Sequence, residues 1–208
     1  WFTDMSADPD AGVRMQVAEA LGNIGGTAAF TILADMSADQ DALVRSYVAE
    51  ALGKIGGDAA VTILADMSAD PDTLVRRYVA EALGKIGGTA TVTILTDLSA
   101  DPDTWVRRRV AEALGKIGGA EAITILADMS ADPDALVRSY VAEALGKIGG
   151  PEAFTILTGM RADPDTLVRR YVALALGNIG GTATVTILRW MSADPDTWVR
   201  RRVAEALG

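Results

Sequence analysis

The sequence predicts an all-α fold, a right-handed α-solenoid built from helical hairpins of 31 residues. Three observations support this prediction. A Val-Arg dipeptide recurs at one fixed spacing, two kinds of helix-breaking segment alternate within each period, and the residues between the breaks form apolar stripes of helical periodicity. Because the repeat runs through residues 1–208, we expect one domain of about seven hairpins, the first of them incomplete.

The repeat is defined by its Val-Arg dipeptide, which occurs seven times, each time 31 residues after the previous occurrence. The positions are Val13-Arg14, Val44-Arg45, Val75-Arg76, Val106-Arg107, Val137-Arg138, Val168-Arg169 and Val199-Arg200. Such uniformity indicates one supersecondary unit stacked on itself. The interfaces between neighbouring units then supply most of the stability.

Each period contains two expected helices, here termed helix A and helix B. The Asp-Pro-Asp loop before helix B supplies side chains that accept N–H groups at a helix start, and a proline that the first helical position tolerates. The paired glycines after helix B favour the left-handed conformation that ends a helix. In the period that starts at Gly88, this pattern predicts helix A at about Thr89–Ser99 and helix B at about Thr104–Ile117.

Both helices carry an apolar stripe that faces the expected core. On helix B of the second unit the stripe is Val44, Val48, Ala51, Leu52 and Ile55. On the following helix A it is Ala59, Val61, Ile63, Leu64 and Met67. Neither helix can bury its stripe alone, so the stripes require stacking of neighbouring units.

A glycine recurs near the end of every complete helix B, where alanine would be more favourable by about 1 kcal/mol. The positions are Gly22, Gly53, Gly84, Gly115, Gly146 and Gly177. We infer that the backbone at this glycine approaches an adjoining helix too closely for a methyl group.

The composition excludes several kinds of chemistry. The chain has 28 acidic and 19 basic residues, a formal charge of −9, and neither histidine nor cysteine. We therefore expect no thiolate or Ser-His nucleophile, no zinc or haem site, no disulfide and no cofactor, and we assign no catalytic or metal-binding residue. No apolar run reaches the length of a membrane span, and no signal peptide is recognisable. The absence of cysteine permits any compartment, with the cytoplasm taken by default.

The pattern D-P-D-x-x-V-R-x-x-V-A-E-A-L-G-K-I-G, from Asp101 to Gly118, resembles HEAT-like repeats of the phycobilisome-lyase type and the artificial alpha-repeat binding proteins derived from them. The resemblance covers the whole chain. It implies that the Asp before helix B and the Arg of Val-Arg form polar ladders between units. Carried over to this sequence, the pairs are Asp41 with Arg45, Asp72 with Arg76, Asp103 with Arg107, Asp134 with Arg138 and Asp165 with Arg169.

The same resemblance implies that the variable columns of helix B line a concave surface and select a partner. The candidate contacts are Leu43, Tyr47, Leu74, Arg77, Tyr78, Trp105, Arg108, Arg109, Tyr140, Arg170, Tyr171, Trp198, Arg201 and Arg202, with Ser46, Ser139, Leu136 and Leu167 in the same columns. Their identities recur after three periods of 31 residues, which indicates duplication of a three-unit block. Trp, Tyr and Arg are the residue types that dominate binding hot spots.

Several functions remain open at this point. We expect a non-catalytic scaffold that binds a protein or peptide, with acidic character favoured by the arginines. The alternative is a structural protein that polymerises end to end through uncapped apolar termini at Trp1, Phe2 and Leu207, as a window of a longer array. Nucleic acid is less favoured because the sequence pI is near 4.5. The helix B columns are also compatible with a simple cover for the edge of the interface between units.

Other motifs are weaker. The Gly-Lys pairs lack the Ser or Thr of a phosphate loop, and the D-x-D loops lack the glycine and distal Glu of a calcium loop, so helix ends and helix caps explain them better. The resemblance raises a chromophore-lyase activity, but no nucleophile or acid-base pair is identifiable.

Arg189 and Trp190 occupy columns that hold Ala34 and Asp35 in the second unit. We therefore expect Trp190 to be exposed, as part of a second contact surface.

Overall fold

The computed structural model describes residues 1–208 as fourteen helices joined by short loops, and it confirms the all-α class. The chain forms two compact units, residues 1–113 and 114–208, with the boundary inside α8 (Thr104–Ile117). Unit 1 contains α1 (Phe2–Met5), α2 (Ala11–Ile24), α3 (Gly26–Met36), α4 (Ala42–Ile55), α5 (Asp58–Met67), α6 (Thr73–Ile86), α7 (Thr89–Leu98) and the first part of α8. Unit 2 contains the end of α8, α9 (Gly119–Met129), α10 (Ala135–Ile148), α11 (Gly150–Met160), α12 (Thr166–Ile179), α13 (Thr182–Met191) and α14 (Thr197–Leu207).

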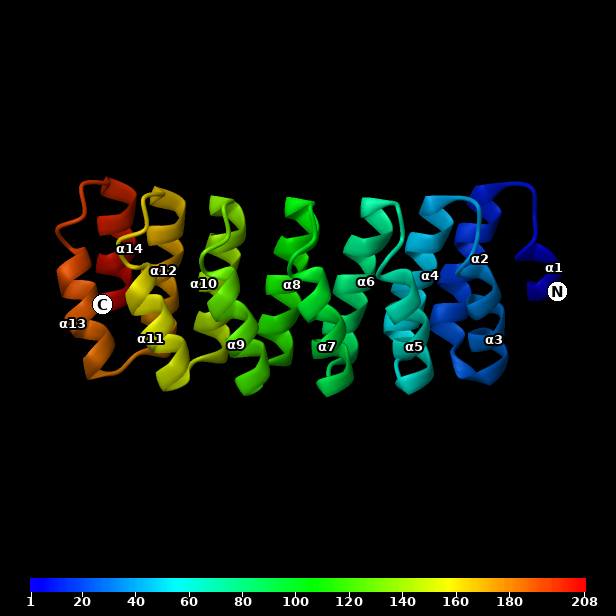
Figure 1. Cartoon of the computed structure of the whole chain (residues 1–208), viewed down its shortest axis with the longest axis horizontal. Helices are drawn as coiled ribbons and strands as arrows, with labels where there is room; N and C mark the ends of the chain where they lie inside the picture. The colour runs from blue at the N-terminus through cyan, green and yellow to red at the C-terminus, as the bar shows by residue number, and fades with distance from the viewer. The chain divides into compact units, whose positions relative to one another are not determined.

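The helices alternate as the sequence predicts, with odd numbers for helix A and even numbers for helix B (Figure 1). Helix α8 has the predicted bounds, and α7 ends at Leu98, one residue before the predicted end. None of the helices combines the length and the apolar character required to span a bilayer. A single solenoid over residues 1–208 remains a prediction.

Local interactions explain where each helix B begins and ends. In α4 the N-cap Asp41 is extended, with φ −93°, and its carboxylate accepts a hydrogen bond from the N–H of Leu43 at 2.8 Å. The C-cap Gly56 has φ +70°, a conformation that glycine adopts without strain, and its N–H donates to the carbonyl of Leu52 at 2.9 Å. The predicted capping by the Asp loops and the predicted helix ends at the glycines are therefore confirmed. The proline does not occupy the first helical position as predicted, because Pro71 precedes Asp72, the N-cap of α6.

The core lies between the two helix layers of each unit. Val44, Val48 and Leu52 on α4 are fully buried, as predicted. On α5 the prediction is wrong at Ala59, which is exposed while Ala60 is buried instead, and Ile63 is only half-buried. The buried residues of α5 then follow one continuous face, namely Ala60, Val61, Leu64 and Met67.

The recurring helix B glycines lie where two B helices almost touch. A Cβ atom built on Gly53 would lie 2.8 Å from Cβ and 2.9 Å from Cα of Ala82 on the next helix B. In unit 2, a Cβ on Gly146 would lie 2.7 Å from Cα of Ala175. Real Cβ contacts are almost never this short, so the predicted close approach is confirmed.

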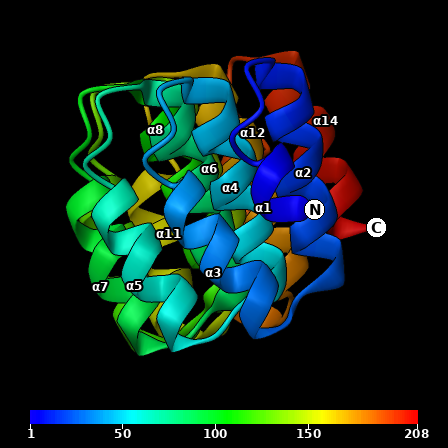
Figure 2. The same cartoon turned by 90° about the vertical axis from the view of Figure 1, so that its right-hand side faces the viewer.

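Because of this close approach, the helices of the B layer pack more tightly than those of the A layer in each unit. In unit 1, α2, α4 and α6 pack on one another, whereas α5 and α7 in the other layer touch at few points (Figure 2). In unit 2 the same contrast holds between the closely packed α10 and α12 and the loosely packed α9 and α11. The helix B layer is therefore the more tightly packed side of each unit, and the helix A layer is more open.

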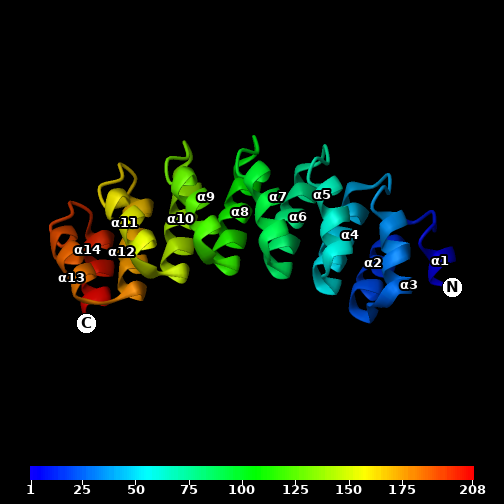
Figure 3. The same cartoon turned by 60° about the horizontal axis from the view of Figure 1, so that its bottom comes forward.

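A buried ladder of ion pairs joins consecutive repeats, but its register differs from the predicted one. Arg45 donates from Nε and Nη2 to the two carboxylate oxygens of Asp70 in the next loop, at 2.7 and 2.9 Å. Its Nη1 donates to the carbonyl of Asp39 at 2.8 Å. Asp41, the predicted partner of Arg45, caps α4 instead. The loops that carry these pairs project along one edge of each unit (Figure 3).

The same correction applies to the other repeats. Within unit 1 the ion pairs are Arg14 with Asp39, Arg45 with Asp70 and Arg76 with Asp101, and within unit 2 they are Arg138 with Asp163 and Arg169 with Asp194. Each of these arginines therefore reaches the first aspartate of the loop before the next helix B, which is Asp-Gln-Asp for Arg14 and Asp-Pro-Asp for the others. The second aspartate, predicted as the partner, is the helix cap.

The ladder shifts the pKa of its carboxyl groups. Burial alone would raise the pKa of Asp70, but hydrogen bonds from the Arg45 guanidinium and from the N–H of Asp72 outweigh burial and lower it. The pKa values of Asp39, Asp163 and Asp194 are lowered by the same balance of causes. The ionised form of these carboxyl groups therefore stabilises the folded state.

Replacing Gly53 by Ala tests the close approach of the B helices. We expect the free energy of unfolding to fall by about 1 to 3 kcal/mol, because the added methyl group would overlap Ala82. The matched control is Gly159→Ala in α11, where nothing lies within 4 Å of the added Cβ. That change should leave stability unchanged or raise it by up to about 1 kcal/mol. Urea denaturation of both variants measures the difference, and equal effects would contradict the proposed packing constraint.

Replacing Asp70 by Ala tests the ion-pair ladder. The change leaves Arg45, whose side chain is 14% exposed, without its carboxylate partner and removes an acceptor for the N–H of Asp72. We expect the free energy of unfolding to fall by about 3 to 5 kcal/mol. Asp66→Ala, at an exposed site four residues earlier, should change it by less than about 0.5 kcal/mol. Similar losses in the two variants would show that the ladder adds nothing specific.

The lowered pKa values also predict how stability depends on pH. An unfolded aspartate titrates near about pH 3.9, so below that pH the unfolded chain binds protons that the folded chain does not. The ladder should make its full contribution to the free energy of unfolding above the aspartate pKa of the unfolded chain. That contribution should be lost as the pH falls through the aspartate pKa values of the folded chain. Denaturation midpoints between about pH 7 and about pH 2.5 test this expectation. A midpoint that is constant down to the lowest pH would contradict it.

Candidate functional site

The predicted partner-binding residues lie on the B helices of both units, and together they form what we term the helix B stripe. In unit 1 it consists of Leu43, Tyr47, Leu74, Arg77, Tyr78, Trp105, Arg108 and Arg109, and in unit 2 of Tyr140, Arg170, Tyr171, Trp198, Arg201 and Arg202. Trp105 and Trp198 are 47% and 57% exposed, and the four tyrosines are half-buried. Ser46 and Ser139 are buried and donate to the carbonyls of Leu43 and Leu136, so they do not belong to the stripe.

In unit 1 the stripe is organised around Trp105. The guanidinium carbon of Arg108, one turn later on α8, lies 4.8 Å from the centroid of the indole ring. The guanidinium carbon of Arg77, on the neighbouring α6, lies 5.8 Å from the same centroid. Both distances are within the range of cation-π attraction, which is strongest for tryptophan. Trp105 therefore lies in contact with cations from two consecutive repeats.

Unit 2 repeats this arrangement around Trp198. The guanidinium carbons of Arg170 on α12 and Arg201 on α14 lie 5.7 and 5.6 Å from the centroid of its ring. The three-unit recurrence of the sequence thus reproduces the contacts as well as the residue types. We call each such group an Arg-Trp-Arg cluster, and each unit contains one.

The tyrosines extend the aromatic surface beyond the clusters. The rings of Tyr140 on α10 and Tyr171 on α12 stack with centroids 6.4 Å apart and planes inclined by 25°. Leu174, one turn after Tyr171, replaces the glutamate of the other repeats and is exposed. In unit 2 the stripe therefore continues from stacked tyrosines to an exposed leucine.

Charged side chains border the aromatic residues. The Nη1 atom of Arg109 donates to Glu112 at 2.7 Å, and that of Arg202 donates to Glu205 at 2.7 Å. The Nε atoms of Arg77 and Arg170 are buried without a hydrogen-bond partner. A buried donor without an acceptor is costly, so these two arginines hold their positions against an energetic penalty.

Two small hollows open on the stripe of unit 2. One of about 210 Å³ lies at Trp198 and is lined by Arg170, Arg201, Arg202 and Glu205. The other, also about 210 Å³, lies at Leu174 and shares Arg202 and Glu205 with the first. Each has room for a side chain of a partner rather than for a cofactor.

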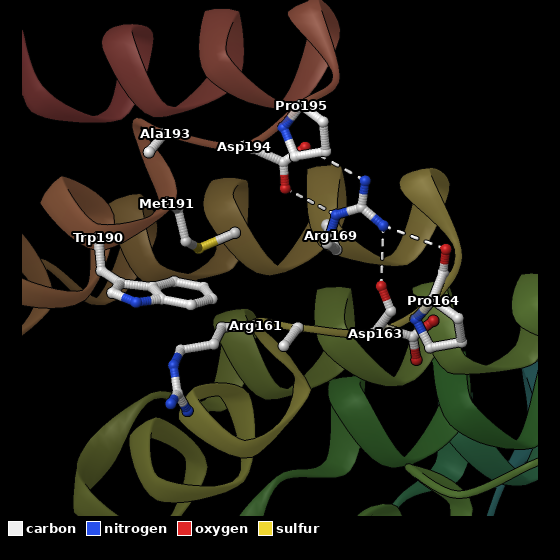
Figure 4. A pocket seen from close by; sticks show the side chains of 10 residues that line it. Arg161, Asp163, Pro164, Arg169, Trp190, Met191, Ala193, Asp194 and Pro195 are labelled. Atoms are coloured by element: carbon white, nitrogen blue, oxygen red, sulfur yellow. Dashed lines mark hydrogen bonds and ion pairs between the residues drawn. The ribbon is translucent and has the colours of Figure 1, made fainter.

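A second surface lies on the helix A side of unit 2, where the sequence indicated Trp190. That residue is 56% exposed, as predicted. Figure 4 shows its ring beside Arg161, and both residues line a pocket of about 660 Å³ together with the loops after α11 and α13. The guanidinium carbon of Arg161 lies 5.0 Å from the centroid of the Trp190 ring. Arg161 was not predicted from the sequence, although it stands in a column that holds serine in the other repeats.

This chain is similar to known proteins in sequence and in fold. A family model described as HEAT repeats matches residues 1–76, 36–109, 67–139, 98–170 and 155–208. Human deoxyhypusine hydroxylase is 27% identical, with a TM-score of 0.51 over 100% of this chain and 82% of that chain. No curated protein matches the sequence.

Two further solved structures share the fold. The complex of CpcE and CpcF of phycocyanin lyase from Nostoc sp. PCC7120 is 23% identical, with a TM-score of 0.60 over 99% of this chain and 85% of that chain. An engineered protein is 22% identical, with a TM-score of 0.55 over 99% of this chain and 66% of that chain.

These likenesses correct one prediction. The composition led us to expect a protein without catalytic activity, but a hydroxylase and a lyase are among the proteins with this fold. The α-solenoid architecture therefore does not separate enzymes from scaffolds, and the expectation of a non-enzyme is not upheld.

The family resemblance itself is confirmed, because the matched segments together cover the chain from its first to its last residue. The family match and the alternating helices also confirm the α-solenoid class of stacked helical hairpins. This chain belongs to the HEAT-repeat proteins.

Proposed function

We propose that this HEAT-repeat chain is a scaffold that binds a protein or peptide through the helix B stripe, with acidic segments as the preferred ligands. The single observation that carries the proposal is the Arg-Trp-Arg cluster. In each unit a half-exposed tryptophan lies against two guanidinium groups, one of them from the preceding repeat. Tryptophan and arginine are the residue types most enriched in binding hot spots.

The chemistry of the clusters favours a carboxylate-rich ligand. A guanidinium group offers a planar fork of donors that matches a carboxylate, and the adjoining ring supplies apolar contact area. The arginines are already packed against the ring, so less side-chain entropy is lost when a ligand binds. The same residues could stack nucleic-acid bases, but the formal charge of −9 opposes binding of a phosphate backbone.

The packing of the B helices supports the same proposal. Close contact between the B helices of a unit brings corresponding columns of consecutive repeats to about 8 to 10 Å from one another. An extended segment could therefore contact the tyrosines, the tryptophan and the arginines of one unit in succession. Repeat solenoids commonly use such inner surfaces for recognition.

Selection from a random peptide library tests the proposed surface and does not require the partner to be identified. The wild-type chain is the bait, and the counter-selection uses a variant with Tyr78→Ala, Trp105→Ala, Tyr171→Ala and Trp198→Ala. We expect enriched peptides to be rich in Asp and Glu. Their dissociation constants, measured by isothermal titration calorimetry, should rise at least about tenfold in the variant.

The matched control is Trp1→Ala, which removes an exposed tryptophan outside the stripe. Peptides selected on the wild type should bind this control with unchanged affinity. The proposal would be contradicted by peptides that bind the stripe variant as well as the wild type, or by a selection that enriches none. A fluorescent single-stranded oligonucleotide in the same assay should not bind, and stripe-dependent binding of it would favour a nucleic-acid ligand instead.

A further inference from the structure

The C-terminal ends of the A helices carry different charges in the two units. In unit 1 each of α3, α5 and α7 carries one exposed aspartate near its C-terminal end, which we term the acidic row: Asp35, Asp66 and Asp97. In unit 2, α9 keeps Asp128 in that column, but α11 has Gly159 and α13 has Trp190. Two arginines lie nearby. Arg161 occupies the column of Ser37, the C-cap of α3, and Arg189 occupies the column of Ala34 in α3. We term Gly159, Arg161, Arg189 and Trp190 the cationic patch.

The cationic patch is hollowed. Arg161 and Trp190 line the pocket of about 660 Å³ together with Met191, Pro164 and Pro195 (Figure 4). A second hollow of about 410 Å³ opens beside Gly159, where the other repeats carry a longer side chain in this column. Both hollows lie in the more open helix A layer. The larger hollow offers apolar walls beside Arg161, which suits a side chain that inserts from outside.

The packing of the chain does not require these replacements. A Cβ built on Gly159 would meet no atom within 4 Å, in contrast to the helix B glycines. Trp190 exposes more than half of its surface, and aspartate fills the same column in the other repeats without harm to the fold. The patch therefore has no role in folding that its more common counterparts could not perform.

The charges around the pocket favour an anionic occupant. Two carboxylates line it, but Asp163 is paired with Arg138 and Asp194 with Arg169. Arg161 donates to the carbonyl of Thr158, which leaves its positive charge without a carboxylate. Arg189 adds a second, exposed positive charge on the neighbouring helix A. The local excess of positive charge contrasts with the chain as a whole, which has a formal charge of −9.

We propose that the cationic patch is a self-association site that binds the acidic row of a second copy of this chain. The two surfaces are complementary in charge. The acidic row places one exposed aspartate on each of three successive A helices, and the cationic patch places Arg161 at the C-cap of α11 and Arg189 on α13. Trp190 would cover the helix surface beside an aspartate, and Arg161 and Arg189 would pair with carboxylates of the row. This contact lies outside the helix B stripe and does not depend on the proposed function of the stripe.

Each copy carries both surfaces, so the contact is heterologous, with different faces of the two copies in contact. Sedimentation equilibrium measures it directly. Between about 1 µM and about 500 µM protein, the mass should rise above that of the 21.7 kDa monomer. Because charge attraction drives the contact, association should weaken at least about tenfold between about 50 mM and about 500 mM NaCl.

A variant that restores the common residues of the repeat provides the decisive comparison. Gly159→Asp, Arg161→Ser, Arg189→Ala and Trp190→Asp convert the patch to the residues found in α3 and its C-cap, so the fold is retained. This variant should remain a monomer over the same concentration range. Trp105→Ala with Tyr78→Ala, and Trp1→Ser with Phe2→Ser, alter the helix B stripe and the N-terminal residues and should associate as the wild type does.

A charge exchange tests the pairing itself. One variant carries Arg161→Asp and Arg189→Asp, and the other carries Asp35→Lys, Asp66→Lys and Asp97→Lys. Each should be monomeric alone, and a mixture of the two should form a mixed complex. A wild-type chain that is monomeric throughout the range at low salt would overturn the proposal. Association that survives the restored repeat, or variants that do not combine, would also overturn it.

Discussion

The contact between each helix B glycine and the alanine of the next helix B is the constraint on which the other features depend. At Gly53 and Ala82 the two backbones approach until no side chain fits between them. This contact draws the B helices of a unit together and leaves the A helices more loosely packed. Tight packing on one side aligns the columns of the helix B stripe, and looser packing on the other side leaves room for hollows.

The ion-pair ladder fixes the repeats at the edge where the loops lie. Asp70 links three groups, since it accepts from Arg45 of the preceding repeat and from the N–H of Asp72, and its carbonyl accepts from Arg76 of its own repeat. One aspartate thereby connects the helix start of its own repeat to the previous repeat. With the glycine contact in the B layer, this sets both the distance and the rotation between neighbours.

The sequence predicted the period, the helices and the role of the helix B glycines because each depends on local spacing. It failed where two candidates stand close together. Arg45 lies one turn from Asp41, and only the structure reveals that capping occupies Asp41 and leaves Asp70 as the partner. Arg161 and Gly159 were missed because each is notable only as a difference from the usual residue of its repeat position. The pockets that they line are visible only in the structure. Ser46 belongs to the variable columns of helix B, yet it is buried.

The central claim is that a column of the repeat becomes a row of neighbouring side chains on the B helices. The chain has no cysteine, so spin labels at Tyr47→Cys and Tyr78→Cys report only on this row. Adjacent B helices at about 8 to 10 Å should give strong dipolar broadening of the electron paramagnetic resonance spectrum, relative to the two single-label variants. A doubly labelled spectrum equal to the sum of the single-label spectra would contradict the account.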